Sequence, residues 1–334
     1  RYMKKKILFC AEDYGSIKSL FPIFVYLSPK FNCRFFTNKD FFCEITKKKV
    51  KSTSQKEIIK RSKKFSPDII FAGLGKKIDR PLLRFYKNRD EVKKIVAFDE
   101  WYYNYKEVTK FKNEYLKINT YLVNDKFCYN KAIREGLDKK KIFITGQFHL
   151  SNIFNNFKGK KKISNNILFL HEDIKKKKNF ENLEYPGYSA KQVLKDLISI
   201  HAHLKLNSKI IVKLHPSAKE NFDYFKKDSI NKYIKFVYND NEVIKYMLSS
   251  KIIIGMRSMA ILESIVLKLP VISYQPNSSF ERCSAVNLGL IKPLKKLIDL
   301  KRIISGEKKI STKSRKLSFI KKIQKINFDK IIYN

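Results

Sequence analysis

Short apolar runs rich in β-branched residues recur along this chain, and each is followed by a polar turn and then by a helical pattern. The clearest runs are residues 4–10, 68–72 and 94–98 in the first half and residues 167–170 and 209–213 in the second. Apolar runs of this length are typical of strands buried on both faces of a parallel sheet. Strands that alternate with helices predict an α/β fold.

The pattern starts again after residues 158–166, a polar and basic stretch that marks a boundary between domains. A chain of 334 residues can bury two hydrophobic cores. We therefore predict one Rossmann-like domain over residues 1–155 and a second over residues 156–310. Residues 311–334 are expected to add a C-terminal helix that can pack back on the first domain.

The chain is strongly basic, with 72 Lys and Arg residues against 31 Asp and Glu residues and a formal net charge of +41. Such a charge attracts nucleic acids and anionic membrane surfaces. The abundance of Lys, Ile and Asn along the whole chain also fits compositional drift in an AT-rich genome. Because zinc-finger spacing and aromatic RNA-binding motifs are missing from the sequence, we expect an anionic membrane surface as a partner and no specific nucleic acid.

Five cysteines are scattered along the chain, and none belongs to a CxxC pair. This usage argues against a disulfide framework and a zinc site, and it fits a reducing cytoplasm. No stretch approaches the roughly 20 apolar residues that a membrane span needs. We expect a cytoplasmic protein, soluble or peripheral at the inner face of the membrane, that needs no metal.

The segment KIIVKLHP, residues 209–216, places Lys213 and His215 at the carboxyl end of a strand. Pro216 stops the strand and keeps the backbone of the residue before it extended. Ligands of open α/β sheets bind beyond this end of the strands. A lysine and an imidazole there predict one wall of an anion site, in which His215 binds a phosphate or donates a proton to it.

A second strand, turn and helix over residues 252–270 is expected to reach the same edge. Ser258 is a natural N-cap for the helix, and Arg257 precedes it. Helix N-termini bind phosphate through their free N–H groups, so this turn predicts the second wall of the site. Glu263 lies among apolar residues of the helix, where an unpaired carboxylate is costly; it can bind a ribose hydroxyl or form a salt bridge with a lysine.

The first half carries its own candidate residues. Asp13 and Gly15 lie in the turn after the first strand, but a GxGxxG fingerprint is absent, which argues against dinucleotide binding by that motif. Asp99 and Glu100 follow the strand at 94–98, where either can act as a general base or Asp99 can cap a helix. Trp101, the only tryptophan, can belong to the core or stack on a sugar ring.

In their order along the chain, these motifs resemble those of GT-B glycosyltransferases, and most of all the bacterial sialyltransferase-like and polysialyltransferase-like enzymes that use CMP-activated sugars. Those families carry an acidic motif, an HP motif and an SS/T motif. Asp99-Glu100 stands at the acidic motif, His215-Pro216 at the HP motif and Ser258 at the SS/T motif. The resemblance implies two Rossmann-like domains facing across a cleft, with the donor nucleotide bound mainly by the second.

The chain departs from this pattern at two positions. Trp101 replaces the usual glycine of the acidic motif, and Met259 replaces the second hydroxyl residue of the SS/T motif, which weakens the case for CMP over CDP or UDP. Residues 258–276 also resemble broader capsule and surface-carbohydrate transferases and, more distantly, the glycerophosphotransferases of teichoic acid synthesis. Thr145-Gly146-Gln147 resembles their interdomain TGxP linker without its proline.

These patterns lead to the expectation of a metal-independent, inverting GT-B transferase without a cofactor, which moves an acidic sugar such as sialic acid from a CMP donor to a glycan or glycolipid hydroxyl in surface polysaccharide synthesis. The alternatives are a UDP-sugar transferase or epimerase, a CDP-glycerol-type transferase of the same fold, and a basic nucleic-acid-binding protein. Asp99, Glu100 and His215 are the expected catalytic residues. Donor contacts are expected from Lys213, His215, Pro216, Arg257, Ser258, Met259, Glu263, His171 and Glu172, and acceptor or sugar contacts from Asp13, Gly15 and Trp101.

Overall fold

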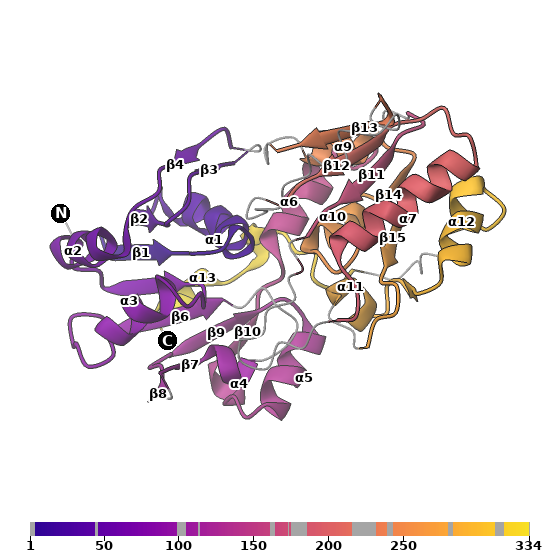
Figure 1. Cartoon of the computed structure of the whole chain (residues 1–334). Coiled ribbons are helices and arrows are strands. Elements are labelled where there is room, and N and C mark those ends of the chain that lie inside the picture. The colour runs from indigo at the N-terminus through magenta and orange to yellow at the C-terminus, as the bar shows by residue number, and fades with distance from the viewer. Residues whose placement is uncertain are drawn as a thin grey trace. The chain divides into compact units, whose positions relative to one another are not determined.

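In the computed structural model the chain forms two compact units (Figure 1). Unit 1 comprises residues 1–156 and 317–334, and unit 2 comprises residues 157–316. The structure describes residues 4–43, 46–98, 105–112, 114–160, 164–172, 174, 186–215, 232–238, 243–279, 283–310 and 317–333.

Six described strands of unit 1 form one parallel sheet in the order β10-β9-β6-β5-β1-β2. Two short antiparallel pairs, β3 with β4 and β7 with β8, lie outside this sheet. The strands are β1 (Lys6–Cys10), β2 (Asn32–Phe36), β3 (Phe41–Phe42), β4 (Lys49–Val50), β5 (Ile69–Ala72), β6 (Lys94–Phe98), β7 (Lys110–Phe111), β8 (Glu114–Tyr115), β9 (Thr120–Val123) and β10 (Ile142–Ile144). The helices are α1 (Tyr14–Leu27), α2 (Gln55–Phe65), α3 (Asp79–Phe85), α4 (Tyr105–Val108), α5 (Lys126–Arg134), α6 (Phe148–Phe157) and α13 (Phe328–Tyr333).

Both faces of this sheet are buried, which explains why its strands are apolar throughout. In β1, Ile7 and Phe9 join a core formed with α1, α6 and α13, while Leu8 and Cys10 join a second core formed with α2 and α3. Successive side chains of a strand point to opposite faces, so alternate residues enter alternate cores. The strands β5 and β6 divide their side chains in the same way.

The C-terminal segment belongs to unit 1, although unit 2 precedes it in the sequence. Its helix α13 contributes Phe328, Ile331 and Ile332 to the core that contains α1. Residues 317–326 form turns and a short 3-10 helix at Ile323–Lys325, where the periodicity of residues 312–326 predicts an α-helix. That expectation is wrong for the described part of the segment. Its backbone groups form hydrogen bonds with Gln147 and Ser151 of unit 1 in place of the bonds of an α-helix.

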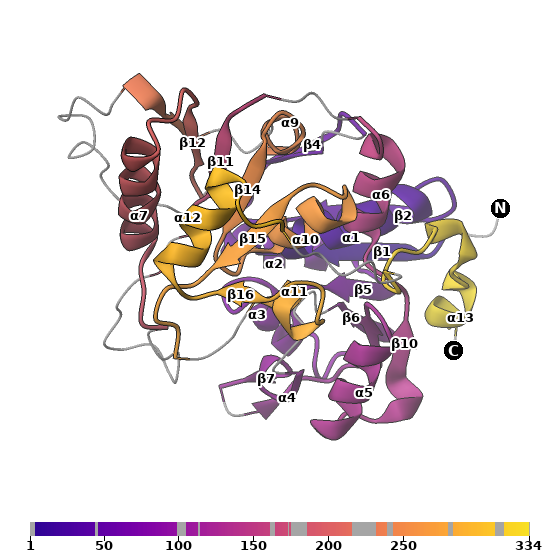
Figure 2. The ribbon, with the colours of Figure 1, turned by 90° about the vertical axis from the view of Figure 1, so that its right-hand side faces the viewer.

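Six described strands of unit 2 form a second parallel sheet, in the order β13-β12-β11-β14-β15-β16. One face of the sheet packs on α7 and α12, which lie beside each other in Figure 2. The strands are β11 (Ile167–Leu170), β12 (Ile210–Lys213), β13 (Ile234–Val237), β14 (Ile252–Gly255), β15 (Val271–Tyr274) and β16 (Pro293–Leu294). The helices are α7 (Ala190–His203), α9 (Val243–Leu248), α10 (Met259–Val266), α11 (Ser284–Asn287) and α12 (Leu297–Ser305).

The prediction of two Rossmann-like domains with parallel sheets is therefore confirmed. Each sheet also has a point where the strand order reverses. The chain runs from β1 to β2 on one side and to β5 on the other, and it runs from β11 to β12 on one side and to β14 on the other. Open α/β sheets bind ligands beyond the carboxyl ends of their strands at such switch points.

Candidate functional site

The switch point of unit 2 is closed by a contact between the loops that follow β11 and β14. Glu172 is the second residue after β11, and its Oε1 accepts hydrogen bonds from the backbone N–H groups of Arg257 and Ser258, both at 2.7 Å. The Arg257 guanidinium adds an ion pair, with 3.4 Å between its Nε and Glu172 Oε2. One buried carboxylate thus holds the turn that leads into α10.

Burial raises the pKa of Glu172 above its usual range. The two N–H groups and the Arg257 guanidinium act in the opposite direction and favour the ionised carboxylate. The backbone N–H groups of Arg257 and Ser258, which lie where the sequence predicts phosphate binding, are therefore already bound to Glu172. The Met259 N–H is the first amide of α10.

Ser258 is the N-cap of α10, as its position in the sequence predicts, and its Oγ accepts the Ala260 N–H at 3.1 Å. Two buried polar side chains also hold the turn before α10. One lies on the neighbouring strand β15, and the other lies in the loop directly after it. The Ser273 Oγ and the Gln275 Nε2 both donate to the carbonyl oxygen of Met256, at 2.5 and 3.0 Å. Sequence reasoning missed these supporting residues.

The KIIVKLHP segment reaches the same edge, but the structure gives its two polar side chains different surroundings. Lys213 is buried, and its Nζ donates to the carbonyl oxygen of Leu214 at 3.0 Å. His215 is exposed. Pro216 lies outside the described residues.

Two further residues of this edge are buried. His171 directly precedes Glu172, and its ring meets Phe169 edge-to-face with 6.2 Å between ring centroids. Glu263 is 4% exposed on α10. The structure thus brings Glu172, Arg257 and Ser258 into direct contact. Lys213 ends β12, His171 directly follows β11 and Met259 begins α10 after β14, and these three strands are neighbours in the sheet.

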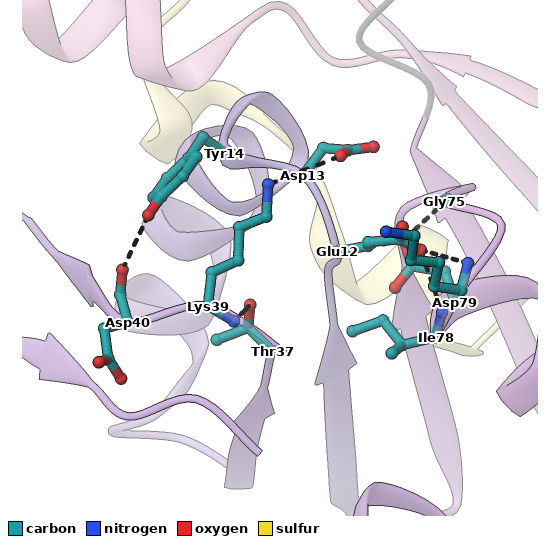
Figure 3. A network of polar contacts seen from close by, with 10 residues as sticks. Glu12, Asp13, Tyr14, Thr37, Lys39, Asp40, Gly75, Ile78 and Asp79 are labelled. Atoms are coloured by element: carbon teal, nitrogen blue, oxygen red, sulfur yellow. Dashed lines mark hydrogen bonds and ion pairs between the residues drawn. The ribbon is translucent and has the colours of Figure 1, made fainter. Parts of the chain in front are cut away.

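Unit 1 repeats the arrangement of Glu172 at its own switch point (Figure 3). Glu12 is the second residue after β1, and its Oε2 accepts the backbone N–H groups of Lys77 at 2.5 Å and Ile78 at 3.0 Å. Ile78 is the N-cap position of α3, as Ser258 is of α10. In both units one glutamate oxygen therefore holds the N-cap amide and the amide before it.

A second buried carboxyl group, that of Asp79 at the first residue of α3, lies beside Glu12 (Figure 3). Asp79 Oδ2 accepts the N–H groups of Gly75 at 2.9 Å and Glu12 at 3.3 Å. Burial raises the pKa of Asp79 to about 8, and the nearby Glu12 charge adds to the rise. Asp79 is therefore largely a neutral acid at pH 7, whereas the sequence gives no sign of its burial.

The two glycines after β5 make room for these carboxyl groups. A Cβ on Gly73 would lie 2.6 Å from Asp79 Oδ2, and a Cβ on Gly75 would lie 2.6 Å from Glu12 Oε2. Glycines directly after a strand permit either a tight turn or the close approach of a ligand. The structure shows that side chains of the protein itself occupy the space.

Asp13 and Gly15 lie at the start of α1. Asp13 is the N-cap residue, and its Oδ1 lies 4.0 Å from the Lys39 Nζ. Figure 3 shows Lys39 on the side of β1 away from Asp79, and Asp13 beyond the end of the strand. Gly15 is inside the helix, where its carbonyl oxygen accepts the Ser19 hydroxyl at 2.8 Å.

The two candidates for the general base, Asp99 and Glu100, lie outside the described residues, as does Trp101. Among the described residues, no group of three or more His, Cys, Asp and Glu side chains is placed to hold a metal ion. None of the described helices combines the length and the apolar character needed to cross a membrane.

A signal for the paired glutamates was present in the sequence. Residues 7–13 read ILFCAED and residues 167–173 read ILFLHED, so the first strand of each unit ends in the same pattern, ILF-x-x-ED. The two copies are 160 residues apart, and each is only a strand and the turn after it, so the pattern does not form a short-period repeat.

Two Rossmann-like units with parallel sheets define the class of this chain as GT-B-like. The chain matches no protein-family model and no curated protein. Solved structures with the same fold include the UDP-GlcNAc 2-epimerase of Methanocaldococcus jannaschii in complex with UDP-GlcNAc and UDP, with a TM-score of 0.66 and 16% identity over 94% of this chain and 97% of that one. The UDP-GlcNAc 2-epimerase of Neisseria meningitidis, bound to UDP-GlcNAc, has a TM-score of 0.68 and 12% identity over 98% and 100% of the two chains. At these identities the likeness establishes the fold.

Proposed function

We propose that this chain is an enzyme that acts on a nucleotide sugar, and that unit 2 binds the nucleotide part at its switch point. The observation that carries the proposal is the turn held by Glu172, in which Arg257 and the Met259 N–H stand at the start of α10. A helix N-terminus with a neighbouring guanidinium suits a phosphate group. The edge also lies where open α/β sheets bind their ligands.

We propose UDP as the nucleotide, in preference to CMP. Support comes from the solved structures of the same fold, two of which contain UDP-GlcNAc and a third of which, from S. aureus, contains UDP. Met259 in place of a second hydroxyl residue also departs from the CMP-sugar pattern. In this assignment Arg257, the Met259 N–H and His215 bind the phosphates, and Glu263 binds the ribose.

The reaction that we propose is epimerisation of the sugar, with transfer from a CMP donor as the competing outcome. The centre to be inverted is the carbon next to the anomeric carbon, and a base removes its proton. The C–H electrons then form a double bond to the anomeric carbon as UDP leaves, and the return of UDP together with a proton on the other face gives the second UDP-sugar. Asp99 or Glu100 remains our proposed base for this step. We propose that the enzyme works in the cytoplasm and uses no metal or other cofactor.

Calorimetric titration with UDP, UDP-GlcNAc, CDP and CMP tests the nucleotide. We expect UDP and UDP-GlcNAc to bind at least tenfold more tightly than CMP, and Arg257→Ala to weaken UDP binding about tenfold or more, as the loss of a charge-assisted contact does. The matched control is Arg302→Ala, which removes an exposed arginine paired with Glu307 at 3.7 Å. Preferential CMP binding would restore the transferase hypothesis, and tight binding of RNA at physiological salt without nucleotide binding would favour the nucleic-acid alternative.

Proton NMR in D₂O tests the reaction separately. An epimerase incubated with UDP-GlcNAc exchanges the proton at the inverted carbon for deuterium and yields a second UDP-sugar. Asp99→Asn and Glu100→Gln should identify the base by loss of this exchange with UDP binding retained. Wild-type protein that binds UDP-GlcNAc but neither exchanges the proton nor forms a second sugar contradicts the epimerase assignment.

A further inference from the structure

A groove of about 600 Å³ lies in unit 1, between the end of the edge strand β10 and the returning C-terminal segment. Figure 2 shows α13 and β10 near each other at this side of the unit. Lysine side chains and apolar side chains make up most of its lining.

The C-terminal segment forms one wall of the groove, and hydrogen bonds attach this wall to the start of α6 and the residue before it. The Gln147 N–H donates to the carbonyl oxygen of Phe319 at 2.8 Å, and the Lys321 N–H donates to Ser151 Oγ at 3.0 Å. Gly146 has a φ of +87°, and a Cβ there would lie 3.0 Å from the Phe319 carbonyl oxygen. The wall is therefore a built part of the unit.

Four lysines, Lys321, Lys322, Lys325 and Lys330, line the groove, and none of its lining residues is acidic. In the part of the chain that the structure describes, none of these four ammonium groups forms an ion pair. Lys321 Nζ donates to the carbonyl oxygen of Ile144 at 3.3 Å, and Lys330 Nζ lies 5.9 Å from the centre of the Phe143 ring. The charges are thus left to attract an anion from outside.

The floor of the groove is apolar. It is formed by Phe143, Ile144, Ile320, Ile326 and Ile331, of which all but Ile331 are partly exposed to solvent. Covering apolar surface is favourable by about 25 cal/mol per Å². A ligand that contacts both the lysines and the floor needs a negative group next to a hydrocarbon part. A purely hydrophilic polyanion lacks the hydrocarbon part.

We propose that this groove binds an anionic phospholipid at a bilayer surface. The lysines hold the phosphate head group, and the apolar floor accepts the first part of an acyl chain. Unit 1 is thereby held at the membrane, which goes beyond the proposed reaction and is independent of its outcome. Each lysine close to an anionic surface strengthens binding by about 1 kcal/mol, or roughly fivefold in affinity.

Sedimentation with vesicles tests the proposal on the full chain. We expect binding to vesicles of phosphatidylglycerol and phosphatidylcholine, and much weaker binding to phosphatidylcholine alone. Substituting glutamine for Lys321, Lys322, Lys325 and Lys330 together should weaken binding to the anionic vesicles by roughly several hundredfold. The matched control changes Lys56, Lys60, Lys63 and Lys64, four exposed lysines of α2, to glutamine and should cost less than tenfold.

Two further experiments distinguish binding of a lipid from binding of other anions. The double variant Ile320→Ser and Ile326→Ser keeps every charge and should still lose vesicle affinity by about tenfold, because the floor no longer accepts hydrocarbon. Soluble glycerol phosphate should not displace the protein from vesicles. Equal losses in the groove and α2 variants, an unchanged serine variant, or full displacement by glycerol phosphate would each overturn the proposal.

Discussion

Glu12 and Glu172 make the same contact in the two units. Each is the second residue after the first strand of its sheet, and one oxygen of each accepts two consecutive backbone N–H groups that end at the N-cap position of a helix. The helices follow different strands, β5 in unit 1 and β14 in unit 2, and in both cases that strand is the neighbour across the switch point. The glutamates therefore fix the loop that a ligand at either edge would meet.

Loss of the Glu172 carboxylate should disturb both stability and nucleotide binding. Glu172→Ala leaves two N–H groups and the Arg257 guanidinium without their partner, which we expect to lower the free energy of unfolding by about 2–4 kcal/mol. Urea unfolding measures this loss, and UDP titration should show weaker binding than in the wild type. The control Glu307→Ala removes an exposed carboxylate and should change stability by less than about 0.5 kcal/mol. A Glu172→Ala protein as stable as that control would contradict the role given to this contact.

Gly75→Ala tests the space that Glu12 occupies. The new methyl group would lie 2.6 Å from Glu12 Oε2, so the carboxylate must leave its two N–H donors, and we expect a loss of about 1–3 kcal/mol. The new methyl group would also lie 2.6 Å from Glu12 Cβ, which alanine would retain, so the second change that removes the clash is Glu12→Gly. The cost of the double variant should be clearly smaller than the sum of the two single costs. Urea unfolding of the four proteins measures the coupling, and strict additivity would show that the two residues do not compete for space.

Asp79 should make stability depend on pH. Its pKa is about 8 in the folded protein and 3.8 in the reference state, so between these values the folded protein binds the extra proton. The contribution of Asp79 to stability is therefore greatest below pH 4, falls as the pH rises and levels off above pH 8. The difference in unfolding free energy between wild type and Asp79→Asn should fall by about 1 kcal/mol per pH unit between pH 5 and 7. A difference that stays constant over this range would show that Asp79 is ionised when folded.

Gly146→Ala should loosen the C-terminal segment. The residue has a φ of +87°, and a Cβ would meet Phe319 and Lys321 of that segment. Gly136→Ala is the matched control, because Gly136 has a φ of +93° with nothing within 4 Å of a Cβ. Both variants carry the cost of a left-handed backbone, but only Gly146→Ala should speed amide hydrogen exchange across residues 317–333. Equal exchange in the two variants would mean that the segment does not depend on the close approach at Gly146.

The strands and the Ser258 cap could be predicted from the sequence because their causes are local. Strands buried on both faces are apolar throughout, and a serine before an apolar helix accepts an N–H group wherever the helix lies. The contact of Glu172 with Arg257 joins residues 85 positions apart and depends on β14 lying next to β11. The order of strands in a sheet has no local signal, so only the repeated ILF-x-x-ED pattern could have indicated it.

The side-chain directions of Lys213 and Asp79 could not be predicted either. Lys213 ends a strand, where either face of the sheet was open to it, and it is bound to the Leu214 carbonyl oxygen. Asp79 follows two lysines and a glycine in a sequence that reads as an exposed loop, but α3 begins at Asp79 and the carboxyl group is turned inward onto Gly75. The burial of each depends on how its loop closes over the sheet.

A crystal structure of the protein with UDP tests the central claim most directly. We expect the phosphates at the start of α10, within about 3 Å of the Met259 N–H and the Arg257 guanidinium, with Glu172 still bound to the N–H groups of Arg257 and Ser258. UDP bound away from the carboxyl edge of the unit 2 sheet, or no bound UDP at concentrations that saturate its relatives in fold, would contradict the assignment of this edge as the nucleotide site.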